Sequence, residues 1–451
     1  MQSKLRFQKM RNPWIASVIN NPNILSELSG SGIKAVTRNF RCILCRGGKL
    51  LCGKTRCPIL VRFYAQMKTI SFVDSFRVEG SAPGGIFVGK FGYPYCFVGP
   101  LVPPFHGDTT ILDTPELWSG KSIEEIVSFR SQLVRGKYRV HVKNVRGGRI
   151  VELTRELALS KLPTDTEVEF TKKPSGRLIL DDEVQPFGPS APLKKLSIGN
   201  IKPDQRIEKA SSDTDLKAED AVIMLYNKGV LISKIQTAFS AGLFGIEKNR
   251  RFVPTKMSIT AVDTIISQNL LEKVKEFPLI NEFRVYEHFA LDNRWIILMV
   301  PSFWQYELIE AWYPKTTWNP EGKEVAIYSS SEGFEGRNTY AEIGGCYYAA
   351  RLAVSEHLER EKRQAGVIIF REAHPGYILP VGVWNVRENV REALKYKPLK
   401  FKSLEEALKY ISSRLDIKIG DWINNSNLLK GMLYQRKLLD FLSKEKPFWP
   451  K

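Results

Sequence analysis

Four of the six cysteines in the sequence stand close together, at Cys42, Cys45, Cys52 and Cys57. The first pair has C-x2-C spacing, which brings two thiolates to one tight turn, and the second pair has the looser C-x4-C spacing. Because zinc prefers four such soft ligands in a tetrahedron, the cluster predicts a structural zinc site with these four cysteines as ligands. Two alternatives stay open: a pair of disulfides, which a cytosolic chain disfavours, and an iron–sulfur cluster, prompted by Pro58.

The first 65 residues around this cluster are strongly basic. They carry twelve Lys and Arg against the single acid Glu27, so 12 − 1 = +11 of the formal net charge of +19 lies here. A block this one-sided favours a polyanionic partner, and nucleic acid is the usual one. The alternatives are a basic face that only keeps the protein soluble and contact with an acidic protein. The candidate DNA ligands nearest to the cysteines are Arg38, Arg41, Arg46, Lys49, Lys54 and Arg56.

Basic residues at every second position begin a second candidate DNA surface at residues 137–149. In a strand, Lys137, Arg139, His141 and Lys143 share one face. The sequence predicts a hairpin, with a turn at 146–149 and a return strand over 150–153. Its cationic face suits a phosphate backbone, although a solvated edge strand protected by charge explains the same pattern. The candidate ligands here are Lys137, Arg139, Lys143, Arg146 and Arg149.

Carboxylates and arginines further along the chain raise the possibility of catalysis. A metal-dependent nuclease needs several carboxylates around a divalent ion, whereas clustered arginines suit a phosphate or nucleotide pocket. As the alternative, Arg371-Glu372 and Arg387-Glu388 are buried ion pairs that join strand to helix, which would explain part of the set without any ligand. The candidate residues are Asp213, Asp215, Asp263, Arg337, Arg371, Glu372, Arg387 and Glu388.

The elements that position these residues predict a mixed α/β (α+β) fold. With 43% hydrophobic and 25% charged residues the composition is that of a globular protein. Helix and strand patterns alternate without segregation. No apolar run is long enough to span a bilayer and no secretory signal precedes the chain, so we expect a cytoplasmic protein without membrane contact.

Individual elements follow from local patterns. Two short buried strands are expected between Gly85 and Pro100, and an irregular excursion between Lys172 and Asp215. A helix is expected over Ser122–Val134, with Ser122 as its cap and Glu125 three residues on. The other expected elements are helices at 217–228, 232–241, 340–364 and 402–414 and a buried strand at 367–370.

The C-terminal tail carries a compact recognition motif. Gln435, Leu438, Phe441 and Leu442 fit the sliding-clamp pattern Q-x-x-aliphatic-x-x-aromatic-hydrophobic. One helical turn would place the three apolar side chains on one face as a plug, with the glutamine at the pocket rim. An ordinary C-terminal amphipathic helix is the alternative. The polar sequence at 424–427 predicts a hinge, so we expect residues from about 425 onward to be flexible.

Several long strings resemble the archaeal Nre proteins. They include Cys42–Cys57, Gly89–Pro100, Val253–Asp263, Ile343–Leu352 and Gly382–Glu388, and with the tail motif they run almost end to end. The resemblance implies a role in DNA-damage repair and association with the sliding clamp PCNA, but no established reaction.

The resemblance also implies an N-terminal and a C-terminal domain. We therefore divide the chain into a basic segment with the zinc module (1–65), two domains (66–300 and 301–420) and a flexible tail with the PCNA-binding motif (421–451). Two functions remain open. One is a non-catalytic repair protein that uses zinc and basic surfaces to contact DNA; the other is a PCNA-recruited nuclease or nucleotide-using enzyme.

Overall fold

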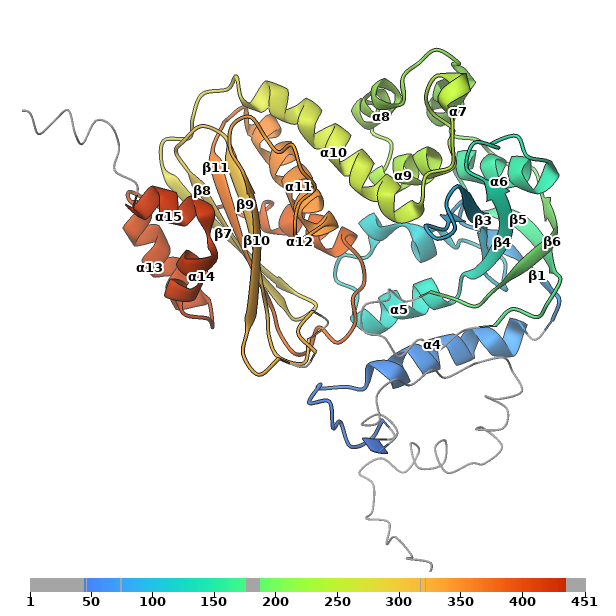
Figure 1. The fold of residues 1–451 in the computed structure, drawn as a ribbon, viewed down its shortest axis with the longest axis horizontal. Helices are drawn as coiled ribbons and strands as arrows, with labels where there is room; N and C mark the ends of the chain where they lie inside the picture. The colour runs from blue at the N-terminus through green and yellow to red at the C-terminus, as the bar shows by residue number, and fades with distance from the viewer. Residues whose placement is uncertain are drawn as a thin grey trace, which may run out of the picture. The chain divides into compact units, whose positions relative to one another are not determined.

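The computed structural model describes residues 44, 45, 47–73, 75–175, 187–316, 318–320 and 322–434 (Figure 1). The predicted mixed α/β class is confirmed, because two six-stranded sheets are each packed against helices. The chain forms two compact units. Unit 1 includes the chain up to Asn269 together with Pro314–Gly322 and Pro375–Asn385, and unit 2 consists of Leu270–Tyr313, Lys323–His374 and the chain from Val386.

The sheet of unit 1 has the strand order β1-β5-β6-β4-β3-β2. Its neighbours are antiparallel except for the parallel pair β4 and β6. One face packs against α6 (Arg149–Leu159) around a core that includes Val134, Leu157, Val168 and Leu193. The strands are β1 (Arg77–Ala82), β2 (Ile86–Val88), β3 (Tyr95–Val102), β4 (Val134–His141), β5 (Thr164–Phe170) and β6 (Ser190–Ile198).

Several predicted helices of unit 1 are confirmed. In α5 (Ile123–Ser131), Ser122 accepts from the Glu125 backbone N–H while the Glu125 carboxylate accepts from the Ser122 N–H, which forms the expected capping box. The helices at 217–228 and 232–241 correspond to α8 (Ala218–Asn227) and α9 (Ile232–Ser240). The remaining helices are α4 (Pro58–Val73), α7 (Gln205–Ser212) and α10 (Thr255–Val274), the last of which continues into unit 2.

Two predictions about unit 1 are wrong. The expected return strand at 150–153 is part of α6, because Val151, Thr154 and Leu157 recur at helical spacing and are buried. The expected irregular excursion from 172 to 215 contains β6 and α7. Its strand pattern is hidden in the sequence by Lys194 and Lys195, where the register shifts against β5.

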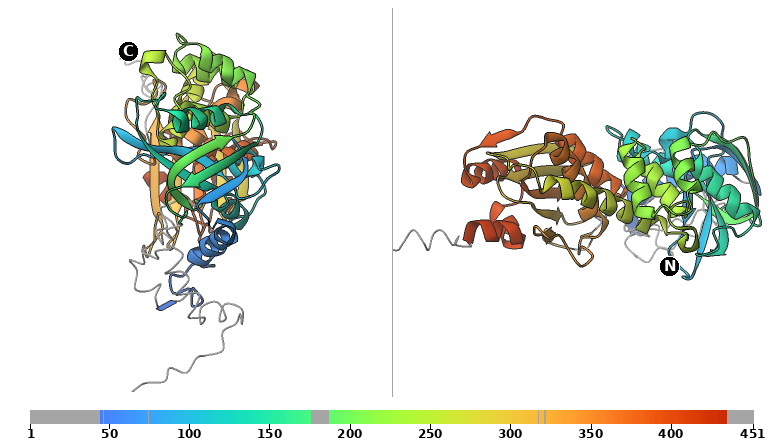
Figure 2. Two further views of the ribbon diagram at one scale, coloured as in Figure 1. Left: turned by 90° about the vertical axis from the view of Figure 1, so that its right-hand side faces the viewer. Right: turned by 90° about the horizontal axis from the view of Figure 1, so that it is seen from above.

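The sheet of unit 2 lies between two layers of helices, as the right view of Figure 2 shows. Its order is β10-β9-β11-β8-β7-β12, and only β9 and β11 run parallel. The strands are β7 (Phe283–Ala290), β8 (Asn293–Val300), β9 (Gln305–Trp312), β10 (Ala326–Glu332), β11 (Gly366–Ala373) and β12 (Leu399–Phe401).

The helices of unit 2 confirm the predictions at 340–364 and 402–414. One face of the sheet packs against α13, α14 and α15 through a core that includes Ile296, Phe370 and Trp422. On the other face lies α11, whose Tyr347 backbone carbonyl accepts from the Tyr306 hydroxyl of β9. The helices are α11 (Gly345–Glu361), α12 (Trp384–Ala393), α13 (Leu404–Arg414), α14 (Ile419–Asn425) and α15 (Asn427–Tyr434). Within the described part of the chain, no helix combines the length and apolarity that crossing a membrane requires.

Candidate nucleic-acid interface

The described cysteines of the predicted zinc site lie at the start of unit 1. Cys45 and Cys57 are buried, Cys52 is half-buried, and all three are free thiols. The loop between Cys45 and Cys57 turns at Gly47 and Gly53, each with a left-handed φ of +72°. The fourth predicted ligand, Cys42, falls outside the described residues.

Cys57 immediately precedes α4, and the backbone N–H groups of Ile59 and Leu60 donate to its sulfur. Burial raises the pKa of the Cys57 thiol, and Cys45 and Cys52 raise it further because their thiolates would repel its ionised form. The three sulfurs are thus close enough to interact electrostatically. A soft divalent cation would supply the counter-charge for such a group, so the donor chemistry fits zinc.

The predicted DNA ligands beside the cysteines differ in accessibility. Lys49 is exposed, and Arg56 is exposed and forms an ion pair with Glu124. Lys54 is only 5% exposed, so its ammonium does not contribute to an open surface. The candidates that fall outside the described residues are Arg38, Arg41 and Arg46.

Strand β4 carries the predicted alternating cations. Lys137, Arg139 and His141 lie on its outer face, while the intervening Val140 is buried on the face that α6 covers. Beyond the strand, Lys143, Arg146 and Arg149 are exposed, and Arg146 forms an ion pair with Glu247. Lys137, Arg139 and His141 therefore share one face, as predicted, whereas Lys143 and Arg146 follow the strand and Arg149 begins α6.

Aromatic side chains of β3 lie beside these cations. Tyr95 and Phe97 are 44% and 41% exposed, and the register pairs them with His141 and Arg139. The Arg139 guanidinium lies 4.5 Å from the centroid of the Tyr95 ring, and the Tyr95 and His141 rings meet edge to face at 5.4 Å. We call Tyr95, Phe97, Lys137, Arg139 and His141 the β3–β4 surface.

Two more aromatics continue this surface into the turn between β2 and β3. Phe91 and Tyr93 are each 78% exposed, and the ammonium of Lys90 lies 4.8 Å from the Phe91 ring centroid. The sequence places an aromatic at every second position from 91 to 97, a signal that we missed because we expected both strands to be buried. The inward side chain of Cys96 is buried, but its neighbours Tyr95 and Phe97 face outward.

The far end of the same sheet face is acidic. Strand alternation places Asp165, Glu167 and Glu169 of β5 on the outer face, while Val168 is buried on the inner one. Glu169 accepts from Lys194 at 2.6 Å, and His106 lies 3.0 Å from Asp165. Glu167 also forms an ion pair with Arg77 at 3.8 Å. The outer face therefore changes from carboxylates paired with bases on β5 to basic and aromatic side chains on β3 and β4.

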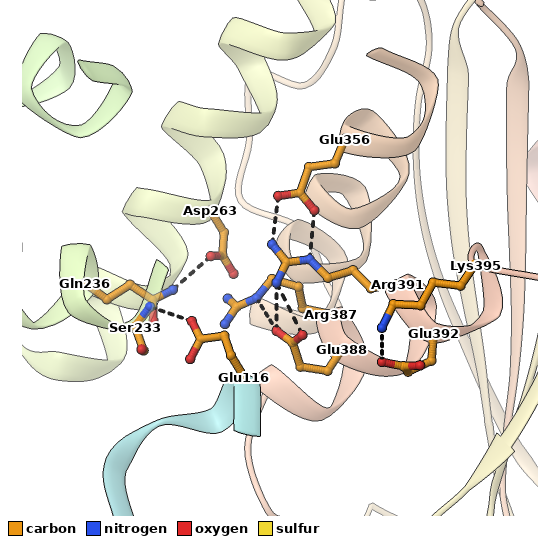
Figure 3. A network of polar contacts seen from close by, with 10 residues as sticks. All are labelled: Glu116, Ser233, Gln236, Asp263, Glu356, Arg387, Glu388, Arg391, Glu392 and Lys395. Atoms are coloured by element: carbon orange, nitrogen blue, oxygen red, sulfur yellow. Dashed lines mark hydrogen bonds and ion pairs between the residues drawn. The ribbon is translucent and has the colours of Figure 1, made fainter. Parts of the chain in front are cut away.

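Two carboxylate candidates of unit 1, Asp213 and Asp263, have structural partners, and the third, Asp215, is exposed. The Asp213 carboxylate accepts from the backbone N–H groups of Asp215 and Leu216 at 3.0 and 2.9 Å, which holds the loop before α8. Asp263 is fully buried in α10, where its carboxylate accepts from the Gln236 amide at 2.9 Å (Figure 3). These contacts explain Asp213 and Asp263 as parts of the fold.

In unit 2, Arg371 and Glu372 follow one another in β11 and therefore point to opposite faces of the sheet. The Arg371 guanidinium donates to Glu310 at 2.6 Å and to Asn293 at 2.9 Å, so the expected pairing with Glu372 is wrong. It also lies 4.8 and 4.7 Å from the ring centroids of Trp295 and Trp312.

Glu372 belongs to the one group of possible metal ligands among the described residues whose ligand atoms all lie within 4.8 Å of one another, with His374 and Asp416. Its carboxylate accepts from the backbone N–H groups of Asp416 and Ile417, both at 3.0 Å. The guanidinium of Arg294 lies 3.5 Å from Glu372 and 3.8 Å from Asp416. Arg294 already supplies a positive charge to both carboxylates, which favours an ion-pair network over a metal site.

The remaining candidates form ion pairs within unit 2. Arg387 donates to Glu388 at 3.1 Å, as the buried-pair interpretation expected (Figure 3). Arg391 donates to both oxygens of Glu356 at 2.8 and 2.7 Å and also to Glu388, so α12 is held to α11. A separate pair joins Arg337 to Glu342 at 2.8 and 2.9 Å.

The residues directly before the tail motif form helix α15. The buried carboxylate of Glu307 accepts from the Ser426 hydroxyl and from the backbone N–H groups of Asn427 and Leu428, and Leu429 is buried. The expectation of a flexible chain from about 425 is therefore wrong for 427–434, because Glu307 caps this helix. The motif residues Gln435, Leu438, Phe441 and Leu442 fall outside the described residues.

Fold and site together define a two-unit α/β protein with a cysteine cluster and an exposed basic and aromatic sheet face. The chain belongs to the archaeal Nre family, which confirms the resemblance. "Archaeal Nre, N-terminal" matches residues 51–319 and "Archaeal Nre, C-terminal" matches residues 332–441.

Three relatives match over most of their length. The chain is 41% identical over 402 residues to DNA repair protein NreB of Archaeoglobus fulgidus, which covers 89% of this chain and 100% of that protein. It is 39% identical to DNA repair protein NreA of the same organism, over 84% of this chain and 95% of that protein. The chain is 32% identical to DNA repair protein NreA of Haloferax volcanii, over 82% of this chain and 90% of that protein. No solved structure matches the chain.

Proposed function

We propose that this protein acts in DNA repair in the cytoplasm and binds DNA through the β3–β4 surface. The observation that carries the proposal is the basic outer face of β4, with Arg139 exposed on it and Lys143 exposed just beyond it, in a chain whose relatives are named DNA repair proteins. Cations on one strand face can follow a phosphate backbone, and their binding releases the counterions of DNA.

Two further parts complete the proposed function. The cysteines Cys42, Cys45, Cys52 and Cys57 hold one structural zinc, which fixes the basic N-terminal segment for DNA contact. The motif from Gln435 to Leu442 follows directly after α15 and recruits the protein to PCNA. Capping of α15 by Glu307 supports this role, because it anchors the chain immediately before the motif.

We favour a non-catalytic role over a nuclease or nucleotide-using enzyme. Within each unit the fold uses several of the predicted carboxylates and arginines: Asp263 pairs with Gln236, Arg371 with Glu310, and Arg387 with Glu388. A catalytic divalent ion needs several carboxylates that converge on it.

Charge variants test the DNA contact. In the full-length protein, Lys137, Arg139 and Lys143 are replaced together by glutamine, and duplex affinity is measured at several salt concentrations. Each lost phosphate contact should flatten the slope of log K against log salt by about 0.9. The matched control removes three exposed lysines of unit 2, Lys402, Lys409 and Lys418.

The control variant should keep the salt slope of the unmodified protein. Equal losses of slope in the two triple variants would mean that only net charge matters, and would contradict a specific DNA surface on β4.

A further inference from the structure

We propose that the β3–β4 surface selects single-stranded DNA, whose unpaired bases stack on Tyr95 and Phe97. This inference rests on the proposed function, because it specifies which form of DNA that surface binds. Its first support is exposure: Phe91, Tyr93, Tyr95 and Phe97 are between 41% and 78% exposed. Contiguous exposed apolar rings on a soluble domain mark a binding surface.

The spacing of the rings excludes bases that remain stacked on each other. Tyr95 and Phe97 are two residues apart on one strand, which places them about 6.6 Å apart along it. Consecutive bases in a duplex strand are about 3.4 Å apart. Two neighbouring bases can therefore each meet one of these rings only in a strand that is extended and unpaired.

The Arg139 guanidinium places a cation beside the two rings. The register pairs Tyr95 with His141 and Phe97 with Arg139, and the Arg139 guanidinium lies 4.5 Å from the centroid of the Tyr95 ring. Cross-strand partners are about 5 Å apart at Cβ. A base on the ring and its phosphate on the adjacent cation would satisfy both parts of a nucleotide, as in sequence-tolerant single-strand binding.

The acidic end of the same face limits where the nucleic acid can run. Asp165 is exposed on β5, and Glu167 and Glu169 lie beside it on that outer face. Each carboxylate is paired with a base on that end of the face: Glu169 with Lys194, Glu167 with Arg77 and Asp165 with His106. Because these ion pairs already engage the bases beside β5, a bound strand should follow β3 and β4 toward the Phe91 turn. This charge pattern favours a polyanion with bases over an apolar peptide, for which the cations would be unnecessary.

Aromatic variants measured on two forms of DNA test the proposal. The full-length protein and its Tyr95→Leu, Phe97→Leu and double variants are titrated with a single-stranded oligonucleotide of about 16 nucleotides and with the matching duplex. Each single substitution should weaken single-strand binding about tenfold and leave duplex binding unchanged. The matched control is Tyr328→Leu, a tyrosine that is 49% exposed on β10 of unit 2.

A spectroscopic signal separates stacking from a general loss of the surface. A 2-aminopurine base in the single strand should be quenched by the unmodified protein, and less by the double leucine variant. A Tyr95→Trp variant, which keeps an aromatic ring at this position, should retain the single-strand affinity and the quenching that Tyr95→Leu loses. Melting temperatures of all variants should agree, because both side chains are more than two-fifths exposed.

The outcomes distinguish this inference from the proposed function. Equal losses on single-stranded and duplex DNA, or no loss on either, would overturn base stacking while leaving DNA binding intact. An unmodified protein that binds neither form would overturn the proposed function itself.

Discussion

Replacing Arg371 with methionine removes a cation from the core of unit 2 while keeping a side chain of similar length. Arg371 is 2% exposed, and its partner Glu310 is 4% exposed. The substitution removes the hydrogen bonds of 2.6 Å to Glu310 and 2.9 Å to Asn293. It leaves the Glu310 carboxylate in the core without its cation.

The expected cost follows from that isolated charge. Removing one member of a buried ion pair typically costs about 3–5 kcal/mol, because the other charge stays desolvated. Methionine can still contact the rings of Trp295 and Trp312, so little of the cost should come from a cavity. Replacing Glu310 with methionine as well should recover most of the loss, because an apolar pair of similar volume is often as stable as the ion pair.

Hydrogen exchange of peptides from β9 and β11 is the appropriate assay, since it measures the stability of unit 2 separately from unit 1. Arg371→Met should lower the free energy of exchange protection by about 3–5 kcal/mol. The double variant with Glu310→Met should restore most of that protection. A loss below about 1 kcal/mol in the single variant would refute this reasoning. An unchanged stability together with lost DNA binding would instead identify Arg371 as a ligand-binding residue.

Burial lowers the pKa of His357 from 6.5 to about 4, although Glu361 opposes the shift. Because the unfolded chain takes up the proton first, stability should fall by about 3 kcal/mol as the pH drops from 6.5 to 4, and His357→Gln should abolish that dependence in pH-resolved melting. Purified protein should contain one zinc per chain by elemental analysis, and Cys57→Ser should lose it; iron in its place would contradict the assignment. Phe441→Ala should weaken PCNA binding about 30-fold in calorimetry without changing the melting temperature, and Asp440→Ala should do neither. A sharp drop in melting temperature for Phe441→Ala would show that this segment is part of the core.

Local patterns in the sequence predicted much of the fold. The capping box at Ser122 and Glu125 needs only residues three apart, and the helix and strand periods located α8, α9, α11 and β11. The error at α6 arose because a stretch as short as 150–153 fits both the helical period and the strand period. Only the burial of Leu153 and Leu157 against the sheet decides for a helix.

In the candidate site, too, the local pattern was predictable from the sequence and the long-range contacts were not. The alternation of Lys137, Arg139 and His141 on one face was predictable, because a strand has a period of two. Which partner each charge takes was not, since Arg371 finds Glu310 across 61 residues. The aromatic repeat from 91 to 97 was visible in the sequence, but apolar side chains alone do not indicate whether a strand face is covered.

The alternation of the two units along the chain bears on whether the chain can be truncated. Segments of unit 1 and unit 2 follow one another in turn, so the chain passes between them at Asn269, Tyr313, Gly322, His374 and Asn385. A gene interrupted after residue 325 would encode β8 and β9 without β11, the strand that lies between them. The fully buried residues Trp295 to Met299 would then have no partner strand on that side. Truncation after residue 325 is therefore expected to prevent the sheet of unit 2 from forming, because its central strand comes from the later part of the chain.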